Sequence, residues 1–271
     1  LLSPKSLESW FKQNGYLNTT DLAVPGDKPE VCLFLDEITD YLDAEKGIAA
    51  ARLLTKLGYK VSFSPALESG RTYISKGLLR KAQKIASANT RIFRKLINEN
   101  RMLVGIEPSA ILSFRDEYPD LVSRDLQEDA KRISGFCITI EEFIASEFNA
   151  GRIDRKAFTE EKVQIKLHGH CQQKSIASTA AAKTMLSIPQ NYTVEEIKSG
   201  CCGMAGAFGY EKRHYELSMK IGEMVLFPAV RDAEPGTIIC AAGNSCRQQI
   251  LDGTGVEALH PVEVLYNALI K

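Results

Sequence analysis

The chain has 271 residues, of which 44% are hydrophobic and 25% are charged, and its 34 Lys and Arg residues balance its 34 Asp and Glu residues. This composition is typical of a globular protein with a sizeable core, and the lack of a basic excess argues against a nucleic-acid partner. No apolar run reaches the roughly 18 residues of a membrane-spanning helix, and no signal peptide is visible at the start. The sequence therefore predicts a cytoplasmic chain of one large domain or two ordinary ones, without a transmembrane segment.

The first part of the chain alternates between predicted helices and strands. A short helix from Ser6 to Gln13 is followed by a polar connector that runs from Asn18 to Pro29. The apolar run from Val31 to Leu35 is typical of a buried parallel strand. The elements expected next are a helix over 44–57 capped by Gly58, a strand over 59–63, a helix over 78–97 and a strand over 102–106. This alternation predicts a parallel α/β layer.

The same plan recurs after a mostly helical, charged stretch between residues 123 and 161. The elements expected here are a strand over 163–167, a helix over 175–186, a strand over 193–197, a helix over 217–225, a strand over 237–241 and a helix over 262–270. In the helix over 217–225, one apolar face is predicted from the spacing of Leu217, Ile221, Met224 and Val225.

The two parts match as an internal duplication. The pairs, in order, are Val31–Leu35 with Val163–Leu167, Glu68-Ser69-Gly70 with Cys201-Cys202-Gly203, Ser109-Ala110 with Ser245-Cys246, and Glu142 with Glu263. A chance match of short motifs is the weaker alternative, because four matches keep the same order. The predicted fold is α/β, with two tandem, pseudo-symmetric units, each a small parallel sheet flanked by helices. The predicted domains are a connector from a longer chain (1–30), a first unit that has lost its cysteines (31–160) and a second unit with an intact site (161–271).

Five of the seven cysteines fall between residues 171 and 246. A disulfide framework would belong to a small secreted domain, so this clustering indicates reduced thiolates that serve one site. Cys171, Cys201, Cys202 and Cys246 each follow a predicted strand, and ligands collect at the carboxyl ends of parallel strands. We therefore expect these four cysteines to meet as metal ligands. Four thiolates suit an iron–sulfur cluster or a tetrahedral zinc ion, and the spacing leaves both open.

Other residues near these cysteines are candidates for binding the cofactor. Gly203 follows the double cysteine, and a glycine lets the main chain turn tightly and approach a ligand. His168 and His170 lie just before Cys171. Each could be a hydrogen-bond donor to the site, a ligand or an ordinary structural histidine. Cys240 lies in an apolar strand and is expected in the core, with a ligand role as the alternative. No catalytic residue is assigned.

Three segments carry a family resemblance: His168–Lys174, Ser199–Glu211 and Gly243–Ile250. They resemble the cysteine-rich CCG domain that occurs in a subunit of heterodisulfide reductase, in the third subunit of anaerobic glycerol-3-phosphate dehydrogenase and in the glycolate oxidase iron–sulfur subunit. Through Met204–Gly206, Ile106–Ser109 and Phe114–Pro119, the chain is most similar to the domain that closes fused flavin-linked dehydrogenases of D-2-hydroxy acids. The resemblance covers roughly residues 31–271.

The resemblance implies an oxidoreductase in which the cysteines bind one iron–sulfur cluster, of the 4Fe-4S type, that relays electrons. A flavin domain and a ferredoxin-like domain would precede this region, and FAD would bind only there. The substrate would be a 2-hydroxy acid of the lactate or glycolate type, and the electron acceptor a quinone or a carrier protein. The implied location is the cytoplasm, with peripheral association at the inner membrane as an alternative. Two other functions stay open: direct reduction of a disulfide or quinone by the cluster, and a zinc-stabilised interaction domain.

Two departures from the family pattern limit what it implies. Many relatives keep a CCG motif in the first unit and a cysteine after Pro-Ser, where this chain has Glu68–Arg71 and Ala110. One centre is therefore the most that is expected. Gly243 stands where some relatives begin a C-x-x-C motif, so a five-cysteine cluster would need Cys240 as well.

Overall fold

The computed structural model describes residues 2–18 and 29–270. The chain forms two compact units, and the boundary between them falls between Phe143 and Ile144. Most of the predicted polar connector lies outside the described residues. The prediction of a connector and two duplicated domains stays a prediction.

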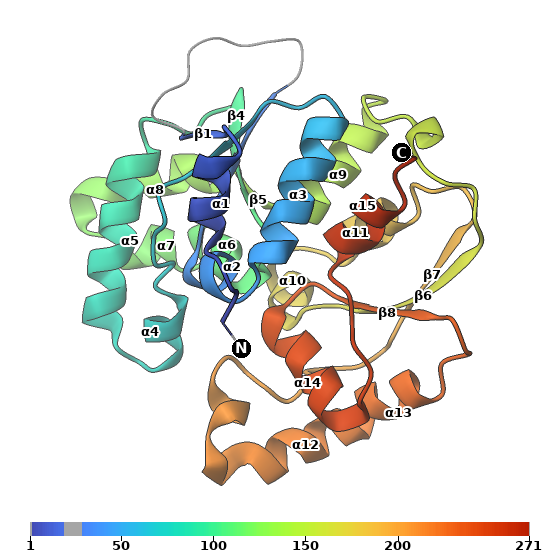
Figure 1. The fold of residues 1–271 in the computed structure, drawn as a ribbon. Coiled ribbons are helices and arrows are strands. Elements are labelled where there is room, and N and C mark those ends of the chain that lie inside the picture. Colours follow the sequence, from blue (N-terminus) through green and yellow to red (C-terminus); the bar gives the residue numbers. More distant parts are fainter. Residues whose placement is uncertain (1, 19–28, 271) are drawn as a thin grey trace. The chain divides into compact units, whose positions relative to one another are not determined.

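The first unit contains a parallel sheet with the strand order β1-β3-β2-β4-β5 (Figure 1). Its strands are β1 (Leu17–Asn18), β2 (Glu30–Leu33), β3 (Val61–Phe63), β4 (Arg101–Gly105) and β5 (Cys137–Thr139). The centre of the sheet is apolar: Val31, Cys32 and Leu33 of β2 are fully buried. This is the pattern of a parallel strand that is covered on both faces.

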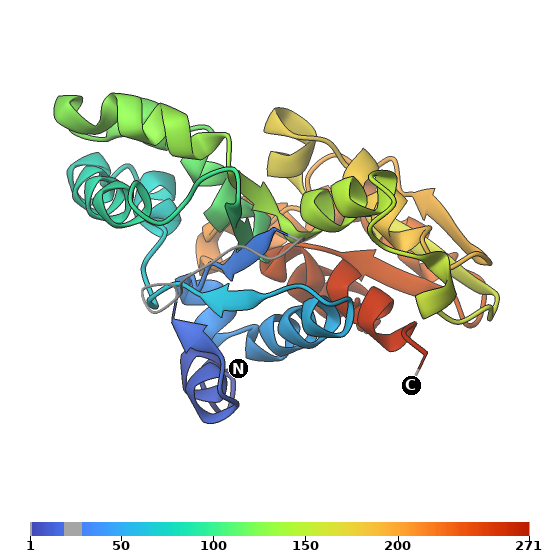
Figure 2. The same cartoon turned by 90° about the horizontal axis from the view of Figure 1, so that it is seen from above.

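Helices connect and cover these strands, and the last of them continues past the boundary into the second unit. They are α1 (Leu7–Gln13), α2 (Glu37–Tyr41), α3 (Ala44–Lys56), α4 (Arg71–Ser75), α5 (Leu79–Phe93), α6 (Pro108–Ile111), α7 (Tyr118–Leu121), α8 (Gln127–Ser134) and α9 (Ile140–Asn149). α5 and α8 lie side by side, as both views show (Figure 2). Asn89 interrupts the apolar stripe of α5 but is buried, because its amide donates to the Glu68 carbonyl and to the Tyr118 hydroxyl.

The second unit contains a parallel sheet with the order β7-β6-β8, built from β6 (Val163–His168), β7 (Tyr192–Glu196) and β8 (Ile238–Ala241). β6 is the central strand and pairs with β7 on one side and β8 on the other. In the first unit, β2 pairs with β3 and β4 in the same way. A further parallel bridge joins Cys240 to Leu259, at the position that β5 has beside β4. The predicted α/β class with two similar parallel-sheet units is confirmed.

The helices of the second unit differ from the prediction, which places none over 226–231 or 244–254. They are α10 (Cys171–Ile176), α11 (Ala180–Leu186), α12 (Tyr215–Met224), α13 (Leu226–Arg231), α14 (Asn244–Thr254) and α15 (Pro261–Asn267). The single helix predicted over 175–186 is wrong, because the backbone leaves the helical region at Ala177 and two helices form.

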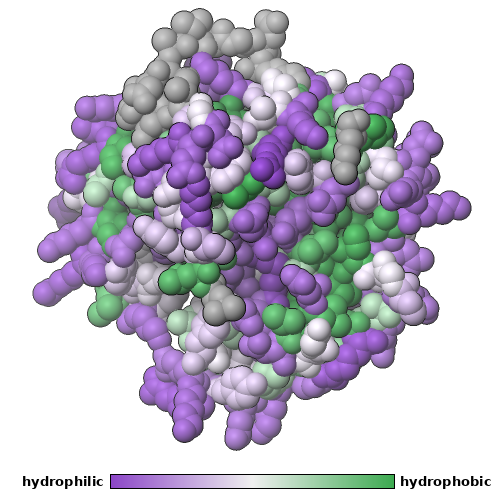
Figure 3. Space-filling model, viewed as in Figure 1, coloured by the Kyte–Doolittle hydropathy of each residue, from purple (hydrophilic) through white to green (hydrophobic). Residues whose placement is uncertain are grey.

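The predicted apolar face of α12 is also wrong. Leu217 and Met224 are 51% and 76% exposed, whereas Ser218 and Gly222 are the buried residues of this helix. Small residues face inward there because the neighbouring chain approaches closely. On the face drawn in Figure 3, hydrophilic side chains predominate, and hydrophobic ones gather to the right of centre, over the second unit.

Phe227 causes this close packing. Its ring lies so near two helices that a Cβ atom would stand 2.3 Å from the ring at Gly222 of α12 and 2.2 Å from it at Gly253 of α14. No real Cβ atom tolerates such distances, so both helices need glycine here. In the described residues, no helix is long and apolar enough to cross a membrane.

We predict that Gly253→Ala destabilises the chain. The added methyl group overpacks a site filled by Phe227, which costs about 1–3 kcal/mol, whereas alanine regains only about 0.5–1 kcal/mol of helix propensity. Urea denaturation should show a net loss of about 1 kcal/mol. The same substitution in a Phe227→Leu background should cost less. An equal cost in both backgrounds would contradict the proposed contact.

Candidate metal centre

The carboxyl ends of the three strands of the second sheet bring the predicted ligands to one edge. His168 is the last residue of β6, and Cys171 begins α10 directly after it. Cys201 and Cys202 lie in the loop after β7, and Cys246 lies in the first turn of α14, after β8. Parallel strands that end together place these loops side by side.

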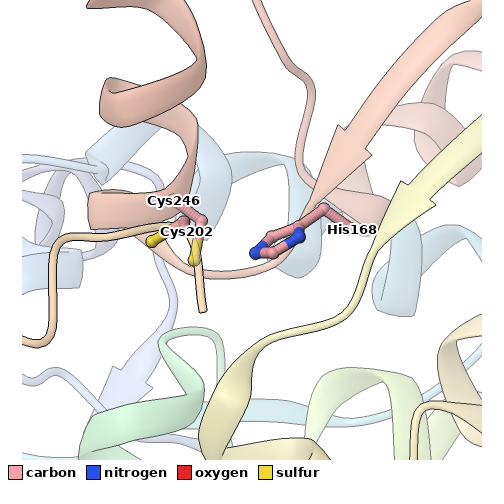
Figure 4. A group of neighbouring side chains, drawn as sticks. All are labelled: His168, Cys202 and Cys246. Atoms are coloured by element: carbon pink, nitrogen blue, oxygen red, sulfur yellow. The ribbon is translucent and has the colours of Figure 1, made fainter. Parts of the chain in front are cut away.

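His168, Cys202 and Cys246 form the buried half of the site. One ligand atom from each lies within 4.8 Å of the ligand atoms of the other two. Their side chains are at most 2% exposed. Figure 4 shows the two sulfur atoms next to each other, with a ring nitrogen of His168 facing them. This group is the only one in the described part of the chain with the spacing of a metal site.

The His168 ring is oriented by one hydrogen bond. Its Nδ1 lies 2.7 Å from the Ser199 hydroxyl oxygen. Its Nε2 is buried and has no hydrogen-bond partner among the described residues. A buried polar nitrogen without a partner costs free energy, so an atom that is able to bind it is expected there.

Cys171 and Cys201 complete a continuous group of thiols and are only partly buried. Contact with the Cys201 thiol, together with burial, raises the pKa of Cys171. Contacts with Cys171 and Cys202 lower the pKa of Cys201. Cys202 in turn contacts Cys246, whose pKa is lowered by that contact and by His168. All four predicted cysteines therefore lie together, and four neighbouring thiolates would repel one another unless a cation bound them.

The backbone after the double cysteine turns tightly around these sulfur atoms. Gly203, Ala205 and Gly206 have positive φ values of 107°, 42° and 68°. The Gly203 N–H donates to Cys201 Sγ at 3.3 Å, and a Cβ atom on Gly203 would lie 2.2 Å from the Ser218 carbonyl oxygen. Only glycine fits this position. Amide donors aimed at sulfur are a feature of iron–sulfur sites.

The backbone N–H group that donates to the Cys201 sulfur, and so favours its thiolate form, comes from this loop. The double cysteine lies on the loop that precedes α12, the helix that contains Leu217. Met204 is buried with Cys202 and Cys246 in one apolar cluster, which limits access of water to the inner side of the site.

His170 and Gly243 pack against the buried side of the site. His170 caps α10, since its Nδ1 accepts from the Gln172 N–H at 3.3 Å. A Cβ atom on Gly243 would lie 2.5 Å from the His170 ring and 3.3 Å from Cys246 Sγ. His170 therefore acts first as a helix cap, and Gly243 makes room for both side chains.

Two cationic side chains bind the backbone of the segments that carry the thiols. The Lys174 ammonium donates to the carbonyl oxygens of Ser199 and Gly200, at 2.6 Å and 3.2 Å. The buried Arg247 guanidinium donates to the carbonyl oxygens of Ala241 and Ala242. Both side chains therefore help to fix the backbone around the site.

Lys174 and Ser199 are not among the residues predicted for the site from the sequence. Only their positions in the sequence connect them with the site: Lys174 lies about one helical turn after Cys171, and Ser199 lies two residues before Cys201. A hydroxyl and an ammonium group are common on any surface, so their types alone do not single them out.

The remaining cysteines lie in the cores. Cys240 packs with Leu167 and Val264 on one face of the second sheet, whereas the neighbouring Ile239 and Ala241 pack in the cluster of Cys202 and Cys246. Because successive residues of a strand point to opposite faces, Cys240 points away from the site. Cys32 and Cys137 are buried in the first unit, and burial raises the pKa of Cys137.

The matching edge of the first sheet carries carboxylates and hydroxyls. The Glu37 carboxylate accepts from the Ser69 N–H at 2.7 Å and from the Ser69 hydroxyl at 2.9 Å. Asp36 caps α2 and is fully buried, and burial together with the Glu37 charge raises its pKa to about 8. Hydrogen bonds hold this edge together, where the second unit has thiols.

Several known proteins are similar to the chain, although no family model matches it. D-2-hydroxyglutarate dehydrogenase of Escherichia coli K12 is 28% identical over 239 residues, which are 87% of this chain and 22% of that protein. The enzyme of the same name from Haemophilus influenzae is 28% identical over 241 residues, 86% of this chain and 23% of the relative.

A second kind of relative has a different substrate in its name. One subunit of anaerobic glycerol-3-phosphate dehydrogenase from Escherichia coli K12 is 24% identical over 247 residues, 89% of this chain and 60% of that subunit. The relatives are dehydrogenases. The chain spans less than a quarter of the length of the first kind and three fifths of the second.

We predict that Cys201 is the first cysteine alkylated by iodoacetamide in the metal-free chain at pH 7. It is partly exposed and has a lowered pKa, whereas Cys171 has a raised pKa and Cys240 is fully buried. Peptide mass spectrometry of briefly treated protein measures the order, and labelling of all seven cysteines in urea is the control. Early labelling of Cys171 or Cys240 would contradict the arrangement.

We predict that Asp36→Asn removes a pH-dependent loss of stability. Between the ordinary pKa of 3.8 and the raised pKa of about 8, the unfolded chain releases the Asp36 proton and the folded chain keeps it. Stability therefore falls as pH rises through this window, by up to about 1.4 kcal/mol per pH unit. In urea denaturation, the free energy of unfolding of the variant should rise relative to that of the wild type from pH 5 to pH 8. A constant difference would disprove the shift.

Proposed function

We propose that this chain is the iron–sulfur electron-transfer module of a flavin-linked dehydrogenase that oxidises a 2-hydroxy acid. The observation that carries this proposal is the contact among the four thiols at one sheet edge, next to a tight glycine-rich loop whose N–H groups donate to sulfur. A disulfide framework or an ordinary core would not need this combination.

The relatives support the coarser part of the proposal, since they are dehydrogenases that are longer than the matched segment. The named substrate of the first kind, D-2-hydroxyglutarate, is itself a 2-hydroxy acid. In our proposal the flavin and the substrate bind in other domains or subunits, and a quinone or a carrier protein takes the electrons. This chain then binds neither FAD nor the hydroxy acid.

The residues of the site fit an iron–sulfur cluster in number and chemistry. Cys171, Cys201, Cys202 and Cys246 would hold it, and when bound it would accept and release single electrons. The loop N–H groups and Lys174 would offset the negative charge of the thiolates. Met204 would keep water from the inner side, while the partly exposed Cys171 and Cys201 would form the side that an electron partner approaches.

In this proposal the first unit is a scaffold that has lost its own centre. Ser69 and Ala110 stand where the duplication predicts cysteines. The Glu37–Ser69 hydrogen bonds support this, because they replace a metal as the link between two loops.

A single zinc ion is the second candidate. The spacing of the donor atoms of His168, Cys202 and Cys246 favours it, because all three lie within 4.8 Å of one another. Cys201 would then close a tetrahedral site, and the module would serve assembly instead of electron transfer.

We predict that the chain, prepared without oxygen, contains iron and acid-labile sulfide and is brown. The double variant Cys201→Ser/Cys202→Ser should lose both, whereas Cys240→Ala should keep them, because Cys240 faces away from the site. Metal and sulfide analysis with a visible spectrum tests this. Zinc without sulfide in the wild type would overturn the proposed function in favour of the second candidate, and loss of iron in Cys240→Ala would overturn the ligand assignment.

A further inference from the structure

Beyond the four cysteines, the site contains one more donor atom that can bind a metal. The Nε2 atom of His168 is buried, faces the sulfur atoms of Cys202 and Cys246, and has no hydrogen-bond partner among the residues that the structure describes (Figure 4). We propose that His168 is a direct ligand, through Nε2, of a metal atom of the centre that Cys202 and Cys246 help to hold. The inference rests on the proposed function in taking that atom as an iron of the cluster.

The ring is arranged as ligating imidazoles usually are. A metal-bound histidine commonly has its other ring nitrogen hydrogen-bonded, which fixes the ring orientation. Nδ1 of His168 has such a partner in the Ser199 hydroxyl, at 2.7 Å. Ser199 is held in turn, because its carbonyl oxygen accepts from the Lys174 ammonium at 2.6 Å. Nε2 is thus the nitrogen left to face the sulfur atoms.

The other buried histidines of this unit show what a structural role looks like. His170 and His260 each cap a helix, and their Nδ1 atoms accept from the backbone N–H groups of Gln172 and Val262. His168 lies at the end of a strand and caps nothing. Its burial and its orientation toward two thiols need another explanation, and coordination supplies one.

Coordination by His168 divides the donors into two groups. His168, Cys202 and Cys246 form a closed inner set, and Cys171 and Cys201 form an outer set that is partly exposed. A neutral imidazole adds no negative charge to the metal, unlike a thiolate. The imidazole would therefore add a nitrogen donor to the centre without adding negative charge.

The test uses the full chain, prepared without oxygen, with natural nitrogen and with 15N-labelled histidine. Pulsed EPR of the reduced centre should show a strong nitrogen coupling that changes with the label. The coupling should persist in His170→Asn, which keeps an acceptor for the helix cap, and should disappear in His168→Ala.

The outcomes separate this inference from the proposed function. Iron and sulfide without a strong histidine coupling would overturn the ligand role of His168 and leave the proposed function standing. Zinc in place of iron would overturn the proposed function, and X-ray absorption at the zinc edge would then test His168. A nitrogen scatterer at about 2.0–2.1 Å beside sulfur at about 2.3 Å would support the ligand role, and sulfur alone would overturn it.

Discussion

The second unit depends on one constraint: three parallel strands end at the same edge of a sheet, and each is followed by a segment that carries sulfur. β6 leads to Cys171, β7 to the double cysteine and β8 to Cys246. The sheet hydrogen bonds fix the spacing of these segments without any metal. The donors therefore meet because of the fold, and the loops only adjust their final positions.

Close backbone approach is the second requirement of the site. Gly203 passes the Ser218 carbonyl oxygen, and Gly243 leaves room for His170 and Cys246. The same need explains why α12 buries Ser218 and Gly222 and exposes Leu217. Because small residues form the buried face of α12, hydrophobic periodicity identifies the wrong face of this helix.

Apolar runs and strand ends are enough to predict the parallel sheets and the meeting of the four cysteines. Cys240 can also be placed from the sequence, since alternation along β8 turns it away from Cys246. β5 is not predicted, because three residues next to a charged stretch give no clear period. The break at Ala177 and the Ser199–His168 hydrogen bond depend on tertiary contacts between distant segments, which local patterns do not encode.

The Glu37–Ser69 hydrogen bonds in the first unit have a consequence for how the chain is made. In the proposed function, the first unit links these segments through side-chain hydrogen bonds and would need no metal to fold. It is also synthesised first, and domains generally fold as units in the order in which they emerge. In the proposed function, the unit that would hold the cluster is synthesised after the first unit. A shortage of iron or sulfide would then delay one half of the chain and leave the other half native.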